Sequence, residues 1–167
     1  MAMLVHACLG ILGRQGYEQL IDNSLQVARN FAEMIKASDD FQLVSEPELC
    51  LLTYRFVPEA VQKMLAASSP EKADSINAVL NQLTVQIQRA QRDAGRSFVS
   101  RTQLQPHGRG EDAQPVIVFR VVLANPLTTE QDLREILEEQ KQIASGLLPQ
   151  MQAQFEFEPE DHERRAG

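Results

Sequence analysis

The 167-residue sequence is poor in several residue types, and each shortage narrows what the chain can do. It has no Trp and only two cysteines, Cys8 and Cys50, which form no Cys-x-x-Cys pair and lack metal-ligand spacing. We interpret both cysteines as buried thiols. The three histidines, His6, His107 and His162, lie far apart in the sequence. We therefore predict that the chain binds no metal.

Long hydrophobic runs and an excess of positive charge are also missing. No apolar run approaches the roughly 18 residues that a membrane-spanning helix needs. The apolar start, residues 1–12, has no basic segment before it, which argues against a signal peptide. The formal net charge is −7, whereas nucleic-acid binders usually carry a basic patch. We expect a cytoplasmic chain that binds neither nucleic acid nor membrane.

The common catalytic motifs are absent as well. The sequence contains no GxSxG, HExxH, P-loop or GxGxxG pattern. Its few lysines all lie in polar or helical surface contexts: Lys36, Lys63, Lys72 and Lys141. Because we find no nucleophile, general base or metal site, the residues alone indicate a binding or accessory domain and not a complete enzyme.

Apolar residues at helical spacing predict the helices of the chain. A glycine break, Gly13–Gly16, separates the first two, Ser69 and Pro70 form a start signal, and Gly95 forms a stop signal. The last helix begins at Thr128 or Thr129, with Gln131 or Asp132 placed for a capping box. We predict helices over residues 2–12, 17–35, 58–67 and 70–94, and from residue 128 or 129 onward.

Four short stretches predict strands, over residues 41–45, 50–57, 97–104 and 116–123. The second strand places Tyr54 on one side and Arg55 on the other, because side chains alternate along a strand. Two pairs of strands separated by a long helix favour an α+β domain. We expect a small antiparallel sheet of about four strands with helices on one face.

One charged residue interrupts the most apolar stretch, because Arg120 lies in the middle of Val116–Pro126. Removing a guanidinium from water costs several kcal/mol unless it is paired. Either the strand lies at a sheet edge, where Arg120 reaches solvent, or Arg120 has an anionic partner. The anionic partner could be a side chain of the same chain, in an internal salt bridge. It could also be a bound carboxylate, which fits the planar fork of an arginine. Arg55 and Arg101 could share a sheet face, and we expect both to be solvated.

Four segments of the chain resemble one known family. They are Gly13–Glu18 with Ala28 and Arg29, Phe41–Val44 with Glu48–Pro58, Ser97–Ser100, and Phe119–Pro126 with Thr129 and Asp132. They are similar to the C-terminal part of the group II pyridoxal-phosphate-dependent amino-acid decarboxylases, which act on glutamate, aspartate or 2,4-diaminobutyrate. The resemblance covers roughly residues 4–150. It implies the C-terminal small domain of a fold-type I pyridoxal-phosphate enzyme.

This resemblance also implies a domain organisation and partners. Residues 1–12 would be the end of an inter-domain helix, residues 13–154 the small domain, and residues 155–167 a charged, disordered tail. The large pyridoxal-phosphate-binding domain of the same polypeptide would be the main partner, and the intact enzyme would be a homodimer. Independently of the resemblance, we interpret Asn125, which precedes Pro126, as a turn and helix-entry residue.

The resemblance assigns one site residue, Arg120. In decarboxylases of acidic amino acids the matching arginine holds a substrate carboxylate, and it would orient the bond to the departing carboxylate perpendicular to the cofactor plane. The Schiff-base lysine, the aspartate paired with the pyridine nitrogen and the stacking histidine belong to the large domain of that family. We therefore expect no catalytic or cofactor-binding residue here, pyridoxal 5'-phosphate only in the full-length enzyme, and no decarboxylation by the chain alone.

A second hypothesis from a different class stays open. An antiparallel sheet covered by helices is also typical of regulatory domains. The chain would then be a stand-alone, non-catalytic α+β domain that binds an amino acid or a protein partner. Fold alone does not separate the two hypotheses.

Overall fold

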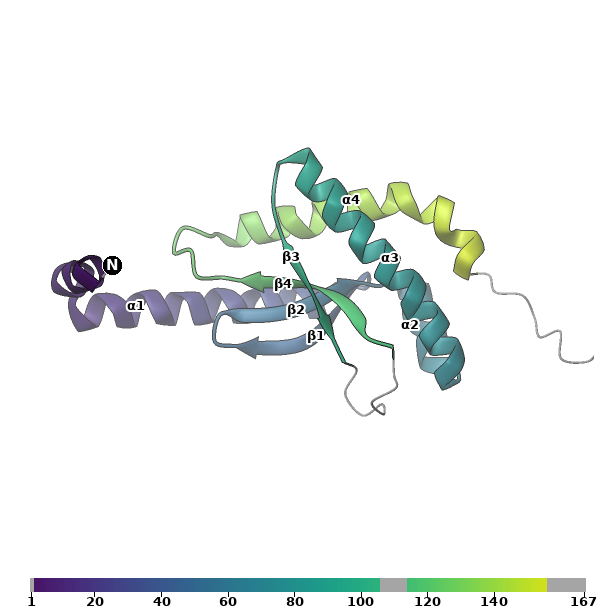
Figure 1. The fold of residues 1–167 in the computed structure, drawn as a ribbon, viewed down its shortest axis with the longest axis horizontal. Helices are drawn as coiled ribbons and strands as arrows, with labels where there is room; N and C mark the ends of the chain where they lie inside the picture. Colours follow the sequence, from purple (N-terminus) through teal and green to yellow (C-terminus); the bar gives the residue numbers. More distant parts are fainter. Residues whose placement is uncertain (1, 106–113, 156–167) are drawn as a thin grey trace, which may run out of the picture.

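The computed structural model describes residues 2–105 and 114–155 (Figure 1). In chain order they form α1 (Ala2–Lys36), β1 (Phe41–Glu48), β2 (Leu51–Phe56), α2 (Glu59–Ala67), α3 (Pro70–Ala94), β3 (Ser100–Leu104), β4 (Val116–Val122) and α4 (Glu130–Phe155). The strands form one antiparallel sheet in the order β1-β2-β4-β3. The predicted α+β architecture is confirmed. His107 and residues 156–167 of the predicted tail lie outside the described residues.

The first helix, α1, is kinked at Gly13, where the backbone is not helical (φ 61°, ψ −176°). Glycine adopts this positive φ without the strain that a Cβ would bring. The two predicted helices, 2–12 and 17–35, therefore meet directly at Gly13 and have no loop between them. Within the described residues, none of the helices is both long enough and apolar enough to cross a membrane.

Two strand boundaries differ from the prediction by more than one residue. The chain reverses at Leu49, which has a φ of 56°, so the residues predicted as a turn, 46–48, belong to β1. Pro47 is compatible with this because β1 is an edge strand, where a missing N–H leaves no ladder bond unmade. The third strand begins at Ser100 and not at Ser97, and Phe98 is 66% exposed before it.

Side-chain caps fix the ends of the long helices as predicted. The Ser69 hydroxyl accepts the backbone N–H of Lys72 (3.4 Å), and Gly95 closes α3 in the left-handed conformation. Before α4, the backbone N–H of Asp132 donates to Thr129 Oγ1 (3.2 Å), and the N–H of Thr129 donates to Asp132 Oδ2 (2.8 Å). This reciprocal pair is a capping box, and it sets the direction in which α4 leaves the sheet.

Tyr54 lies at the centre of the core with no exposed surface. Its ring contacts three aromatic rings, with centroid distances of 5.4 Å to Phe31, 6.0 Å to Phe41 and 5.3 Å to Phe119. Its hydroxyl donates to Gln140 Oε1 at 3.0 Å. Burial raises the pKa of the Tyr54 hydroxyl, so this group stays a neutral donor.

A chain of polar side chains continues from Tyr54 through the interior. Gln140 Nε2 donates to Gln91 Oε1 (3.2 Å), and Gln91 Nε2 donates to Ser97 Oγ (2.7 Å). The Ser97 hydroxyl donates to Glu139 Oε2. These bonds join β2, α3 and α4, and they satisfy polar groups that would be costly to bury alone.

Replacing the Tyr54 hydroxyl tests this network. We expect Tyr54→Phe to lower the free energy of unfolding by about 1–3 kcal/mol, because Gln140 Oε1 would lose its buried donor. Tyr17→Phe is the matched control; Tyr17 is half-buried in α1 and should change stability by less than about 0.5 kcal/mol. Urea unfolding of both variants provides the measurement, and equal stabilities would contradict the role assigned to the network.

Candidate functional site

A row of residues crosses all four strands on the side of the sheet opposite to Tyr54. The register pairs Ser45 with Thr53, Thr53 with Arg120, and Arg120 with Ser100. Directly opposite residues in antiparallel strands project to the same side. The Ser45 and Thr53 hydroxyls are hydrogen-bonded (2.7 Å), and the Ser100 hydroxyl donates to the backbone carbonyl of Arg120 (2.6 Å). We call these four residues the polar row.

Arg120 carries the charge of the polar row, and its side chain is exposed. Its strand lies between β2 and β3, so the prediction of a sheet edge as the way out for Arg120 is wrong. Its guanidinium also makes no ion pair with any residue of the ranges 2–105 and 114–155. Arg120 therefore reaches solvent from an inner strand, although its neighbour Thr53 in the polar row is buried.

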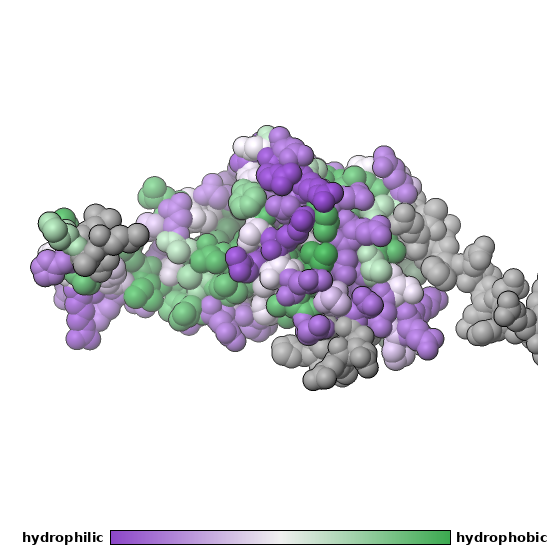
Figure 2. Space-filling model, viewed as in Figure 1, coloured by the Kyte–Doolittle hydropathy of each residue, from purple (hydrophilic) through white to green (hydrophobic). Residues whose placement is uncertain are grey.

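This side of the sheet is covered at one end and open at the other. Along β4, Val118 is fully buried, Arg120 is exposed, and Val122 is 55% exposed. Leu49, in the turn between β1 and β2, is 76% exposed. Figure 2 shows hydrophobic residues gathered around this turn and the β4–α4 connection, beside α1. Arg120 thus lies next to exposed apolar surface, which is typical of a contact with further protein.

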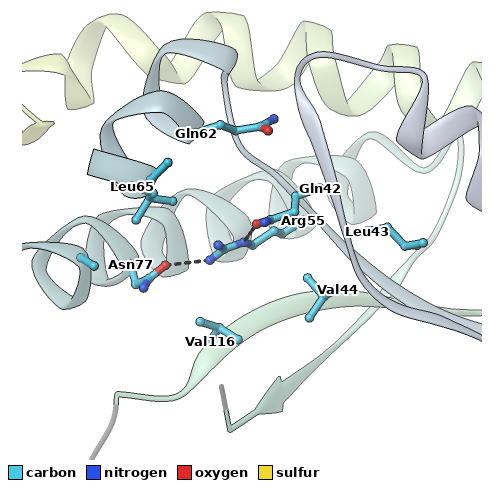
Figure 3. A pocket seen from close by; sticks show the side chains of 10 residues that line it. Gln42, Leu43, Val44, Arg55, Gln62, Leu65, Asn77 and Val116 are labelled. Atoms are coloured by element: carbon cyan, nitrogen blue, oxygen red, sulfur yellow. Dashed lines mark hydrogen bonds between the residues drawn. The ribbon is translucent and has the colours of Figure 1, made fainter. Parts of the chain in front are cut away.

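Arg55 differs from the prediction, because it is only 8% exposed. Its Nε donates to Gln42 Oε1 (2.8 Å) and its Nη1 to Asn77 Oδ1 (2.8 Å), as Figure 3 shows. Burial lowers the pKa of Arg55 to about 10, so the side chain stays charged at neutral pH. Alternation in β2 correctly placed Arg55 opposite Tyr54. The cover over Arg55 comes from α3, a distant segment that alternation does not reveal.

Arg101 and Asn125 complete the predicted residues. The register pairs Arg101 with Phe119, on the same side as Tyr54, so the prediction that Arg101 and Arg55 share a sheet face is wrong. Arg101 is exposed, as expected, and its Nη1 donates to Gln88 Oε1 (3.2 Å). The Asn125 side chain accepts the backbone N–H of Leu127 (3.0 Å), which confirms its role as a turn residue.

A pocket of about 470 Å³ opens beside Arg55 (Figure 3). It lies between the hairpin of β1 and β2 and the helices α2 and α3, and Arg120 is not part of it. Its walls combine apolar side chains with three amides and one guanidinium. The lining residues are Gln42, Leu43, Val44, Arg55, Gln62, Leu65, Ala66, Ala73, Asn77 and Val116.

The lysines lie at the surface, and three of them pair with carboxylates. A lysine that condenses with an aldehyde at neutral pH needs a pKa lowered by desolvation or by a nearby cation. Hydrogen bonds to carboxylates instead raise the pKa of three lysines. The pairs are Lys36 with Glu46, Lys63 with Glu59, and Lys141 with Asp40. Lys72 is exposed, and no lysine lines the pocket.

In the described ranges, no cluster of His, Cys, Asp or Glu is arranged to hold a metal ion. Neither cysteine is fully buried, contrary to our expectation.

The exposure of Arg120 predicts that its side chain contributes little to stability. We expect Arg120→Ala to change the free energy of unfolding by less than about 0.5 kcal/mol, because no ion pair within the described residues is lost. Phe119→Ala, at the neighbouring and fully buried position, should cost about 3–5 kcal/mol in the same urea titration. A loss above about 1 kcal/mol for Arg120→Ala would instead support the hypothesis that Arg120 makes an internal salt bridge.

Comparison with known proteins finds relatives that are named as decarboxylases. No family model matches the chain. It is 52% identical over 146 residues to an aspartate 1-decarboxylase of Aliivibrio fischeri, covering 87% of this chain and 26% of that protein. It is 31% identical over 137 residues to the cysteine sulfinic acid decarboxylase of Homo sapiens, covering 81% and 24%. The chain thus spans about a quarter of the length of the curated relatives it matches.

Solved structures give the same result. The crystal structure of mouse CSAD in its apo form superposes with a TM-score of 0.67 at 25% identity, covering 84% of this chain and 27% of that chain. The fold is also similar to the glutamate decarboxylase domain of a Vibrio parahaemolyticus protein named for diaminobutyrate-pyruvate transaminase and L-2,4-diaminobutyrate decarboxylase, with a TM-score of 0.63 at 19% identity, covering 86% and 26%. The homologues and structural neighbours of the chain are group II pyridoxal-phosphate-dependent decarboxylases, and the chain corresponds to a segment of these larger enzymes.

Proposed function

We propose that this chain is the C-terminal small domain of a pyridoxal-phosphate-dependent decarboxylase, and that Arg120 holds a carboxylate of its substrate. The observation that carries the proposal is the position of Arg120, which is charged, exposed and without an ion-pair partner in the described part of the chain. The names of the two curated relatives, aspartate 1-decarboxylase and cysteine sulfinic acid decarboxylase, support a small acidic amino acid as the substrate class.

The polar row supplies the positioning that such a role requires. Arg120 extends from an inner strand held by ladders on both sides. The Ser100 hydroxyl also binds its backbone carbonyl. The planar fork of the guanidinium can donate two parallel hydrogen bonds to one carboxylate, which fixes both the distance and the orientation of the substrate. Arg120 would hold the substrate so that the bond to the departing carboxylate stands perpendicular to the cofactor plane.

The division of labour follows from the lysines. Pyridoxal phosphate supplies an electron sink when it is bound. The lysines of this chain do not fit a role in holding it, since three of them have raised pKa values. The cofactor would therefore be held by the rest of the polypeptide, and this chain would contribute substrate orientation alone.

Exposed apolar side chains in α1 and after β4 indicate that other protein packs against this chain. The first segment of α1 exposes Met3 (88%) and Ile11 (82%), and the connection after β4 exposes Leu127 (80%). Large exposed apolar side chains mark contact surfaces when several lie together. In the intact enzyme, which we propose to be a cytoplasmic homodimer, the large domain would cover the open side of the sheet around Arg120.

A titration with pyridoxal phosphate tests the division of labour. After borohydride reduction and peptide mapping of the 167-residue chain, we expect no lysine to carry a stoichiometric pyridoxyl group, because Lys36, Lys63 and Lys141 are held protonated by carboxylates. Free lysine at matched concentration is the control for non-specific labelling. Stoichiometric labelling of a single lysine would contradict the proposal, since this chain would then carry its own cofactor site.

Substitution of Arg120 tests the substrate contact. In a decarboxylase that contains this chain, we expect Arg120→Lys to lower kcat/KM by about 10- to 100-fold, because the ammonium keeps the charge but loses the bidentate hydrogen bonds. Arg101→Lys is the matched control, since Arg101 lies on the neighbouring strand and projects to the other side of the sheet. Unchanged kinetics of the Arg120→Lys enzyme would refute the assignment.

A further inference from the structure

We propose that the pocket beside Arg55 binds an organic carboxylate, at a site separate from Arg120. The proposal does not depend on the function proposed above, because Arg120 is not among the residues that line this pocket. Its basis is the juxtaposition of a buried guanidinium and a cavity of about 470 Å³ whose walls combine apolar side chains with polar groups.

The charge of Arg55 has no counter-charge in the pocket. Its two acceptors, Gln42 and Asn77, are neutral amides, and the residues that line the pocket include no Asp or Glu. A guanidinium that is 8% exposed has lost most of its hydration, and amide oxygens compensate only part of that loss. Because its pKa is still about 10, the pocket holds a positive charge at neutral pH. An anion at this position would be stabilised by it.

The guanidinium also keeps donors for a ligand. It carries more N–H groups than Gln42 and Asn77 accept. Among the described residues, Glu139 Oε1 is a fully buried side-chain atom that has no hydrogen-bond partner, whereas no nitrogen of Arg55 is in this situation. The remaining donors are therefore not fully buried, and Arg55 is one of the residues that line the cavity. The two amides hold the guanidinium from opposite sides (Figure 3), so that its orientation is set before a ligand arrives.

The walls select the kind of anion. Leu43, Val44, Leu65 and Val116 supply apolar surface around the charged group. A fully hydrated phosphate or sulfate would leave this surface unused, whereas a carboxylate with a short aliphatic body would cover it and pair with Arg55. The carboxylate could belong to a free small molecule or to an acidic side chain of a protein segment, and both present the same chemistry.

The test is a titration of the isotope-labelled 167-residue chain, followed by 1H–15N NMR at constant ionic strength. The probes are butyrate for a free ligand, N-acetyl-glutamate amide with a blocked C-terminus for a protein side chain, and inorganic phosphate. We expect butyrate or the glutamate amide to give saturable shifts at Gln42, Arg55 and Asn77, with a Kd on the order of millimolar. Saturation by butyrate indicates a free ligand, and saturation by the glutamate amide alone indicates a side chain. Saturation by phosphate alone, or no saturable shift, would overturn the proposal.

Two variants and one control make the assignment specific. Arg55→Lys keeps the charge and should weaken binding by about tenfold or more, because the fork is lost. Ala66→Leu narrows the pocket from its exposed rim and leaves Arg55 in place, so it should also weaken binding even if Arg55→Lys folds poorly. Arg120→Lys should leave the Kd unchanged. Equal affinity in the Ala66→Leu and Arg120→Lys variants would overturn the proposal.

Discussion

The position of Tyr54 is the constraint on which the rest of the structure depends. Its ring packs between the aromatic side chains of α1, β1 and β4, and its buried hydroxyl requires a partner, which Gln140 provides from α4. A buried hydroxyl without an acceptor would be destabilising. The helix α4 must therefore cross the sheet with Gln140 above Tyr54, and Gln91 then links it to α3. One polar atom thus fixes the relative placement of several elements.

The same residue decides which way Arg120 points. Tyr54 is paired with Phe119, and both lie on the core side. Arg120 follows Phe119 and so projects to the other side, because side chains alternate along a strand. A shift of one residue in this register would place the Arg120 guanidinium in the aromatic core and Phe119 in water. Burying the guanidinium and exposing Phe119 would both cost free energy. The aromatic core therefore keeps Arg120 on the outer side of the sheet.

The sequence allowed the elements to be predicted but not what covers them. Periodicity located the helices and strands, and local signals located the caps at Ser69, Gly95 and Thr129, since both depend on neighbouring residues. The charge of Arg120 indicated that it needs either solvent or a partner, but its place on an inner strand depends on the strand order. Arg55 was wrongly expected in solvent, because its burial depends on Asn77, 22 residues away in α3. The charges of the site were visible in the sequence, and their surroundings were not.

The surroundings also decide how strongly each arginine can act. A carboxylate that meets Arg120 in this chain alone pairs with a charge in water, where an ion pair contributes little. Val122, two residues along β4 on the same side of the sheet, is 55% exposed. If protein covers this side, water is excluded and the same pair becomes much stronger. Arg55 is already desolvated by α3. The two arginines therefore call for different conditions: Arg120 becomes effective when the open side of the sheet is covered, whereas Arg55 is prepared for an anion within the chain itself.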